Sequence, residues 1–599
     1  MVLQTAKPAS FPERNSDSST DVTARRHLLT VNVEDYFQVG VFQKFIGVDK
    51  WYRFESRLQQ NVERILELLD QHRTQATFFV LGWTAEQQPE LVRAIADAGH
   101  EIASRGFLHQ SLHTLPKDRI REDLLRARAV LEDVTGQPVD GFRLSDGWLD
   151  KSTLWLLDEV VAAGYRYDSS LMPKQRDFAD EPKWRNIQNI QTANGPVLEI
   201  PLSTIPLPGG WLPIAGGNYQ RQVPDFLMRR LVDRAVESDA EPFVMYFQVW
   251  ELDADQPRLS VADRMTRFRH YRKLGKYGRI LPQYLERYSF TSVRSHAQQM
   301  KSPLHRLAES PPVASRSVRR HQIDSASIQE LASAGKVPPK RQFSSHLSPT
   351  DEACLATDRT PITIVIPCYN EEVTLRYLAN TLNSVYAKLV QKYSPTILFV
   401  DDCSSDNTFD VLHQQFGHDP AVEIIRHETN QGVSAAILTG LRAARTEIVC
   451  SMDCDCSYDP HELARMLPRL TDDVSMVTGS PYHKDGLVRN VPAWRLVLSR
   501  GLSWIYQRLL KEELATWTSC FRVYRRSHIL DLPLKENGFL GTAELAAQLV
   551  LNHRRIAEHP ATLEVRLFGL SKMKTIRAIM SHLKLLSRIA ASRFFKTKA

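Results

Sequence analysis

Two stretches of this chain repeat one pattern, in which a short apolar run is followed by a segment with apolar positions every three or four residues. Short apolar runs predict buried strands, and spacings of three and four predict helices. In the first stretch the predicted strands are residues 27–33, 76–81 and 100–104, and the predicted helices are residues 59–72, 89–99 and 119–134. Strands that alternate with helices favour parallel pairing with crossover helices.

The same alternation restarts at Pro361. The predicted strands there are residues 362–366, 396–400, 422–425 and 447–451, and the first predicted helix covers residues 371–389. This order predicts a doubly wound, mostly parallel sheet, which binds its ligands at the carboxyl ends of its strands. Both halves of the chain are therefore expected to be α/β.

The segments outside these stretches are polar. Residues 1–26 are Ser-rich, and residues 301–360 hold ten Ser and six Pro together with scattered Lys and Arg. Such compositions cannot bury much apolar surface. The predicted organisation is a disordered tail over residues 1–26, a first domain over 27–299, a flexible basic linker over 300–360 and a second domain over 361–599.

Composition and charge restrict the class of protein. The chain has 599 residues, of which 43% are hydrophobic, and its net charge is +7. This charge is too small to indicate nucleic-acid binding when no recognisable nucleic-acid-binding motif is present. All seven cysteines lie in the second half with no disulfide spacing, which favours free thiols in a reducing compartment. No apolar signal segment or run of about 18 apolar residues is present, so a cytoplasmic protein is expected.

Carboxylates follow four consecutive predicted strands of the second stretch. The strand ends lead into PCYNEE, DDCSSDNT, NQGVSAA and DCDCSYDP, and these should meet at one edge of the sheet. Asp453 and Asp455, one residue apart at a strand end, can present oxygens to one Mg²⁺ or Mn²⁺ ion, with diphosphate oxygens filling the remaining positions. Asp401 is a candidate to hold a nucleobase or a ribose.

These motifs resemble those of glycosyltransferase family 2, whose fold is GT-A. The segments TSCFRVYRR, GFLGTAELAAQL and EVRLFGLSKMK further resemble the polyprenyl-phosphate (dolichol-phosphate) sugar synthases, with Cys403 and Cys520 where glycine is usual. The resemblance implies that Asp453 and Asp455 hold the metal. It implies a nucleotide-sugar site made by Pro367, Tyr369, Asn370, Glu371, Asp401, Asp402, Asn430, Gly432 and Asp453. It also implies an acceptor-phosphate site made by Arg566, Ser571 and Lys572, with Arg522 as a further candidate.

A lipid phosphate is already an anionic nucleophile at pH 7, so it needs positive charge for positioning more than it needs a base. A hydroxyl acceptor would instead require a base, and Asp459 or Glu544 are the candidates. After Glu564 the chain has basic residues and no acidic ones, with apolar positions at helical spacing. A basic amphipathic helix suits an anionic membrane surface, so peripheral contact with the inner face of the plasma membrane is expected; the alternative is a helix packed on the sheet.

The first stretch resembles polysaccharide deacetylases with the NodB homology domain, through LLTVNVEDYF, ATFFVLGW, GHEIASRGFLH, GFRLSDGWLD and MYFQVWELD. The resemblance implies an irregular (β/α) barrel. Those enzymes use a divalent metal, usually zinc, held by a carboxylate and two His, with an Asp base and a late His acid. The corresponding site here is degenerate, at Asn32, Glu34, Asp35, Arg105, His109, Arg143 and Gln248.

Two of these substitutions are chemically decisive. The Asn32 amide cannot serve as a base, and the Arg105 guanidinium cannot ligate zinc. His109 and His113 restore the metal-ligand spacing only in a shifted register. The expected protein is thus a metal-dependent sugar transferase of cell-envelope or exopolysaccharide synthesis with an inactive deacetylase-like domain. A bifunctional transferase and deacetylase, and a non-catalytic glycan-binding regulator, are the alternatives.

Overall fold

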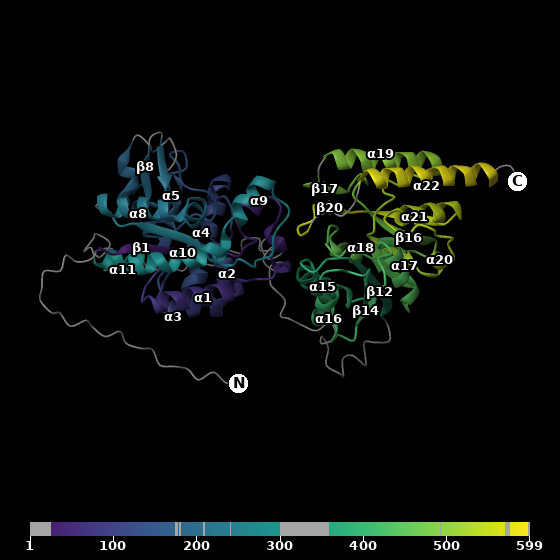
Figure 1. The fold of residues 1–599 in the computed structure, drawn as a ribbon, viewed down its shortest axis with the longest axis horizontal. Helices are drawn as coiled ribbons and strands as arrows, with labels where there is room; N and C mark the ends of the chain where they lie inside the picture. The colour runs from purple at the N-terminus through teal and green to yellow at the C-terminus, as the bar shows by residue number, and fades with distance from the viewer. Residues whose placement is uncertain are drawn as a thin grey trace, which may run out of the picture.

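The computed structural model describes residues 25–173, 178, 181–207, 210–239, 241–299, 359–491, 493–569 and 575–596. The predicted tail and linker lie almost wholly outside these residues, so their predicted disorder stays a prediction. Figure 1 shows two α/β units side by side, the first drawn from purple to teal and the second from green to yellow. This confirms the α/β fold class expected for both stretches.

The first unit is built on a curved, mostly parallel sheet. Its path runs β10-β1-β2-β3-β4-β5-β7-β6, and β11 also pairs with β1. The bounds are β1 His27–Val33, β2 Thr77–Val80, β3 Glu101–Ser104, β4 Gly141–Phe142, β5 Tyr167–Asp168, β6 Gln188–Thr192, β7 Gly195–Glu199, β10 Val244–Gln248 and β11 Phe290–Thr291. Among the described residues the ladder has two free ends, which suits the irregular barrel that the sequence predicts.

Helices cover this sheet where the apolar periodicity predicts them. They include α1 Leu58–Gln71, α3 Pro89–Asp97 and α4 Lys117–Thr135. Helix α4 ends at Gly136, whose φ of 65° lies in the left-handed region that favours glycine at a helix end. Every residue of β1 is buried, and Leu29, Val31 and Val33 share one core with apolar side chains of α1 and α3. The predicted strands and helices of the first stretch are therefore confirmed.

The second unit contains a seven-stranded sheet with the order β14-β13-β12-β15-β18-β16-β19. The bounds are β12 Thr360–Cys368, β13 Tyr393–Asp401, β14 Val422–Arg426, β15 Ile448–Ser451, β16 Val474–Ser480, β18 Arg522–Arg525 and β19 Arg555–Pro560. The first four strands are parallel, whereas β18 is antiparallel to β15 and β16. The strand order reverses between β12 and β15, which makes their carboxyl ends the expected ligand site.

Local contacts explain where the flanking helices begin. Helix α15 covers Leu375–Leu389 and starts four residues later than predicted, because Thr374 donates to both the carbonyl and the carboxylate of Glu371 in a preceding turn. Helix α17 covers Val433–Ala443 and follows Gly432, whose φ is 99°. A Cβ at Gly432 would lie 2.8 Å from the carbonyl oxygen of Asn537, so glycine is required there.

Two long helices lie side by side along one edge of the second unit (Figure 1). They are α19, Ala493–Leu510, and α22, Thr575–Lys596. Helix α22 packs on α21, Leu540–Leu551, through buried Leu585, Leu586 and Ile589. In the described part of the chain, no helix has the length and apolarity needed to cross a membrane.

Candidate functional site

The candidate site lies at the switch point between β12 and β15. The loop after β15 carries Asp453 and Asp455 and turns sharply, since Cys456 has a φ of 53°. The backbone N–H and the hydroxyl of Ser457 donate to Asp455 Oδ1 over 2.9 and 2.7 Å. The loop therefore fixes Asp455 Oδ1, whereas Asp455 Oδ2 is not held by Ser457.

A partly buried arginine joins the two strand ends. Arg566 forms an ion pair with Glu371, which follows β12, and its Nε lies 3.4 Å from Asp455 Oδ2. Burial would lower the pKa of Arg566, but the charges of Asp455 and Glu371 hold it above its ordinary value. The guanidinium is thus a fixed positive charge beside the aspartate pair.

The environment of Asp453 suits a cation. Burial, and secondly the charge of Asp455, raise the pKa of Asp453 to about 7, and the neighbouring Cys520 side chain partly opposes this rise. A divalent cation would relieve this repulsion, and hard carboxylate oxygens are the donors that Mg²⁺ and Mn²⁺ accept. Within the described ranges no group of three or more metal-ligating side chains occurs. Two carboxylates suffice for a Mg²⁺ or Mn²⁺ ion whose other ligands are diphosphate oxygens and water.

The residues predicted for the nucleotide gather along the neighbouring strand ends. Asp402 is buried and accepts hydrogen bonds from the N–H groups of Gln431 and Gly432, at 2.8 and 2.7 Å. Asn430 donates to the Asp402 carbonyl oxygen over 3.1 Å. Asp402 therefore orders the loop before α17, and its carboxylate is occupied by that loop in this structure.

Other predicted nucleotide residues contact the loop that follows β13 or the end of β14. Asp401 is fully buried and pairs with Arg426 at 3.2 Å, whereas the Asn370 side chain accepts from the Ser405 N–H at 2.7 Å. Tyr369 is 38% exposed, and Pro367 is half-buried at the strand end. Together the predicted nucleotide residues form a rim at the carboxyl ends of β12 and β13, and only some of their side chains are exposed to solvent.

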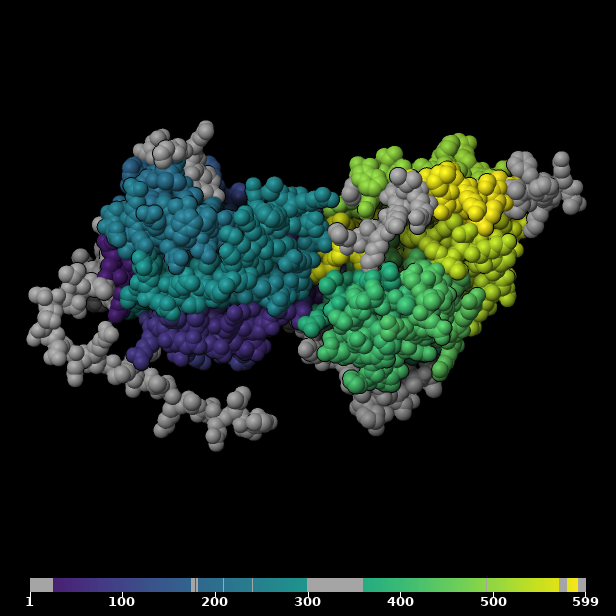
Figure 2. Space-filling model, viewed as in Figure 1, coloured from purple at the N-terminus to yellow at the C-terminus, as the bar shows by residue number. Residues whose placement is uncertain are grey.

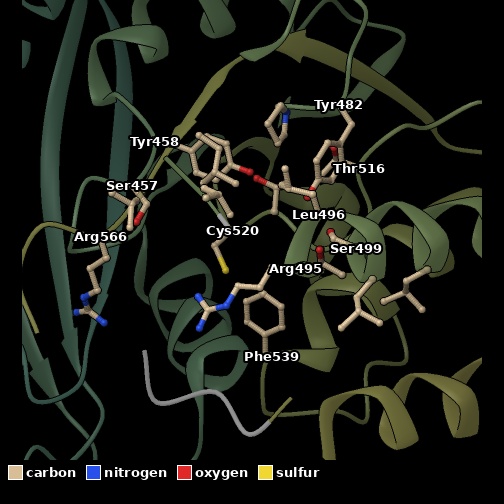
Figure 3. A pocket seen from close by; sticks show the side chains of 18 of the residues that line it. Ser457, Tyr458, Tyr482, Arg495, Leu496, Ser499, Thr516, Cys520, Phe539 and Arg566 are labelled. Atoms are coloured by element: carbon tan, nitrogen blue, oxygen red, sulfur yellow. The ribbon is translucent and has the colours of Figure 1, made fainter. Parts of the chain in front are cut away.

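A cavity of about 770 Å³ opens on the other side of the aspartate pair. Asp453, Asp455 and Arg566 line one end of it, most of the lining is apolar, and α19 and α22 supply many of the apolar side chains. Figure 3 shows the guanidinium of Arg495 between Phe539 and Arg566, on the side of the cavity opposite Arg566. Of the predicted nucleotide residues, only Asp453 lines this cavity. The predicted nucleotide residues therefore lie on one side of the Asp453–Asp455 pair, and the cavity lies on the other.

Several lining residues were missed by the sequence analysis. They include Arg495, Tyr482 and Trp494, together with Ser260 of the first unit. The basic and apolar alternation within residues 493–510 was the available signal for α19, whereas nothing in the sequence signals Ser260. Only the fold brings that residue to the cavity.

The acceptor-site candidates divide into three cases. Arg566 lines the cavity as expected. Arg522 is fully buried and donates to the carbonyl oxygens of Trp517 and Thr542, both at 2.8 Å, which does not support a role in binding phosphate. Ser571 and Lys572 lie outside the described residues.

The two candidate bases for a hydroxyl acceptor are engaged elsewhere. Asp459 pairs with Arg53 and His461, and Glu544 is buried and accepts from two backbone N–H groups, of Lys535 and Glu536. Neither residue is among those that line the cavity. This arrangement favours an acceptor that is already ionised.

The degenerate centre of the first unit contains an ion pair where a metal would be held. Glu34 is 1% exposed and pairs with Arg105, and its other oxygen lies 3.5 Å from His109 Nε2. Burial would raise the pKa of Glu34, but the charges of Arg105 and His109 lower it overall. The guanidinium occupies the ligand sphere of Glu34, so these residues do not fit a zinc ion.

Most of the other positions in this centre also have hydrogen-bond partners. Arg143 is buried and donates to the Asn32 side chain at 3.0 Å, and burial together with Arg105 lowers the pKa of Arg143 to about 9. Asp35 accepts from the backbone N–H of Arg57 at 3.0 Å, and burial raises its pKa to about 7. Gln248 accepts a hydrogen bond from Trp250, and the side chain of His113 is exposed. These contacts occupy the polar groups of Asn32, Asp35, Arg143 and Gln248 with partners inside the protein.

Comparison with known proteins identifies the class of the second unit. The profile described as Glycosyl transferase family 2 matches residues 363–532. The polyprenol monophosphomannose synthase of Mycolicibacterium smegmatis is 31% identical over 218 residues, which are 35% of this chain and 80% of that protein. The chain belongs to glycosyl transferase family 2 and is a glycosyltransferase. The dolichol-phosphate mannosyltransferase of Pyrococcus furiosus is 26% identical over 226 residues, which are 37% of this chain and 62% of that protein. This chain therefore spans just under two thirds of the length of that relative.

The first unit matches two further profiles. Residues 48–167 match Polysaccharide deacetylase, and residues 169–298 match a domain of unknown function, DUF3473. Among solved structures, a CE4 family pseudoenzyme from Bacillus anthracis is 16% identical with a TM-score of 0.24, over 46% of this chain and 65% of that one. Glucosyl-3-phosphoglycerate synthase from Mycobacterium tuberculosis is 18% identical with a TM-score of 0.31, over 41% and 83%.

Proposed function

We propose that the second unit transfers a sugar, with Mg²⁺ or Mn²⁺, from a nucleotide-sugar to a polyprenyl phosphate, making a lipid-linked sugar for cell-surface glycan assembly. The proposal rests on the arrangement of two aspartates and one arginine at the cavity. Asp453 and Asp455 stand beside the fixed charge of Arg566 at one end of a cavity whose wall is mostly apolar. A lipid with one anionic end fits such a cavity, and the relatives named above act on dolichol or polyprenol phosphates.

The chemistry follows from the charges. When bound, the metal stabilises the negative charge that develops on the departing nucleoside diphosphate. Arg566 holds the acceptor phosphate, and Arg495 on the opposite wall is placed to share that role. An oxygen of that phosphate attacks the anomeric carbon as the bond to the diphosphate breaks. The chain needs no base for this step, which agrees with the engagement of Asp459 and Glu544.

Helices α19 and α22 supply a surface for the lipid. Their exposed apolar side chains are Trp494, Val497, Leu498, Trp504, Ile505, Ile579, Met580 and Leu583. Arg495, Arg500 and Arg508 are exposed on α19 as well. Exposed apolar side chains interspersed with basic ones suit the surface of an anionic membrane. We therefore propose peripheral attachment through both helices, while Leu585 and Leu586 of α22 pack inward on α21.

The test is glycolipid synthesis by the full chain. The protein is incubated with Mn²⁺ or Mg²⁺, a panel of nucleotide-sugars and undecaprenyl phosphate, and new glycolipid is detected by mass spectrometry. Asp455→Asn should abolish the product, whereas Asp473→Asn, a surface carboxylate paired with Arg555, should not. Donor hydrolysis without glycolipid would refute the lipid acceptor, and glycan binding without turnover would favour the regulator alternative.

We propose further that residues 27–299 form a separate domain whose deacetylase and zinc sites are lost. The Glu34–Arg105 ion pair and the Asn32 amide support this proposal. The measurement is acetate release from N-acetylated glycans by the Asp455→Asn full chain, with and without added zinc. Zinc-dependent release would contradict the proposal and favour the bifunctional alternative.

A further inference from the structure

The first unit contacts the two loops of the second unit that carry the candidate site. Figure 2 shows the two units touching along the side where the purple and teal atoms meet the green and yellow ones. The first loop is residues 453–461, which hold Asp453 and Asp455. The second is residues 563–568, which hold Arg566. We call them the aspartate loop and the arginine loop.

One chain of contacts begins at Lys50. Its ammonium pairs with Glu564 of the arginine loop. The Glu564 N–H donates to the Ser457 carbonyl oxygen at 2.9 Å, and Tyr458 forms an antiparallel bridge with Leu563. Ser457 in turn holds Asp455 Oδ1 through its N–H and hydroxyl. Lys50 is therefore three contacts away from a proposed metal ligand.

A second chain of contacts begins at Arg53. Its side chain is 6% exposed, and Nη2 lies 3.1 and 3.0 Å from the two carboxylate oxygens of Asp459. Asp459 caps the short helix that ends the aspartate loop by accepting from the His461 N–H at 3.1 Å. Burial would raise the pKa of Asp459, but His461 and Arg53 hold it far below its ordinary value, so the pair stays ionised.

The far end of the arginine loop is paired with the first unit. The Ser260 N–H donates to the Leu567 carbonyl oxygen at 2.7 Å, and Leu259 bridges Phe568 in an antiparallel sense. Phe54, Tyr377 and Phe568 are buried together, with ring centroids 5.0 to 5.9 Å apart. Arg566 thus lies between two anchors, one at Glu564 and one at Leu567.

We propose that the deacetylase-like unit organises the transferase site, with Lys50 and Arg53 as positioning residues that hold the arginine loop and the aspartate loop. This inference rests on the proposed function of that site. Loops that bind substrates are often mobile, and holding reacting groups in place contributes strongly to rate, since a displacement of about 1 Å can cost roughly 100-fold. Ser260 extends the same role by completing the cavity wall.

The structure offers a matched control. Glu55 pairs with Arg376 on α15 across the same interface, and this ion pair joins neither the aspartate loop nor the arginine loop. Glu55→Gln therefore weakens docking of the two units without releasing the loops. Lys50→Gln and Arg53→Gln remove one docking contact each and also release a loop. Comparison of the three full-length variants separates positioning from docking.

The first readout is hydrogen exchange measured by mass spectrometry, which needs no activity. Arg53→Gln should speed exchange in residues 453–461, and Lys50→Gln in residues 563–568, each by about tenfold relative to Glu55→Gln. The double variant Lys50→Glu with Glu564→Lys restores the ion pair with reversed charges and should regain protection that Lys50→Glu alone loses. Exchange equal to that of Glu55→Gln in both loops would overturn the inference.

The second readout is kinetic and separates the two roles. Lys50→Gln should raise the KM for undecaprenyl phosphate by about tenfold with a smaller change for the donor, because it releases Arg566. Arg53→Gln should raise the Mn²⁺ concentration needed for UDP or GDP binding. If wild-type protein makes no glycolipid, the proposed function fails while exchange still decides the inference. If glycolipid forms and all three variants behave alike, the inference fails and the function stands.

Discussion

Replacing Arg105 by methionine tests whether the first unit uses a guanidinium in place of a metal. Arg105 and Glu34 are 5% and 1% exposed, and the second partner of Glu34, His109, lies at 3.5 Å. Arg105→Met leaves a carboxylate buried without its main partner, which costs about 3–5 kcal/mol. It also removes the hydrogen bond to the Ser145 carbonyl oxygen at 2.6 Å.

The pH dependence gives this prediction its signature. In the wild type the pKa of Glu34 is lowered from 4.5, so its contribution to stability is present above the unfolded pKa and is lost as pH falls through the folded pKa. Without Arg105, burial raises the pKa of Glu34, and proton uptake relieves the unpaired charge at low pH. The loss in the free energy of unfolding should therefore be larger at pH 8 than at pH 5.

The assay is hydrogen exchange of β1 and β3 in increasing urea, because a chain with two units does not unfold in one step. Glu34→Gln with Arg105→Met removes both charges and should recover most of the stability. Arg93→Met breaks an exposed pair with Glu90 and should cost at most about 0.5 kcal/mol. A loss for Arg105→Met below about 1 kcal/mol that is equal at both pH values would refute the reasoning.

Three further predictions follow from the same contacts. Arg105→His should place a second imidazole near Glu34 and His109, so added zinc should raise the melting temperature of the variant and leave that of the wild type unchanged. Because burial and Asp455 raise the pKa of Asp453 to about 7, metal-dependent transfer should fall roughly tenfold per unit below pH 7 and level off above it; a flat profile from pH 5.5 to 8 would contradict this. Trp494→Ser with Trp504→Ser should weaken binding to anionic vesicles in a flotation assay by tenfold or more, whereas Phe226→Ser, an exposed aromatic of the first unit, should have no effect.

The sequence predicted the parts of the fold that depend on local pattern. Strands such as residues 27–33 and 362–366 are rich in Leu, Ile and Val, and their burial in a parallel sheet follows from that composition. The aspartate pair was predictable because the carboxyl ends of parallel strands meet at one edge. Arg522 shows the limit, since an arginine that serves the core and one that binds phosphate look alike until their burial is known.

The contacts between the two units could not be predicted from the sequence, because they depend on pairs that leave no local pattern. Lys50 and Glu564 are separated by 514 positions, and single charged residues at such separations carry no periodic signal. Ser260 and Leu567 pair through backbone groups, which every residue possesses. Side-chain identity therefore says nothing about that pairing, and only the packing of both units reveals it.

The degenerate centre and the interface are structurally connected. Asp35 follows Glu34, and it accepts from the Arg57 N–H at the end of the segment that carries Lys50, Arg53 and the aromatic anchor Phe54. The buried Glu34 carboxylate is neutralised by Arg105, so an ion pair holds the chain around the end of β1. The segment that Asp35 anchors presents Arg53 to Asp459. The proposed loss of deacetylase chemistry and the proposed positioning role of this unit are therefore compatible, because positioning requires the shape of the unit and not a metal.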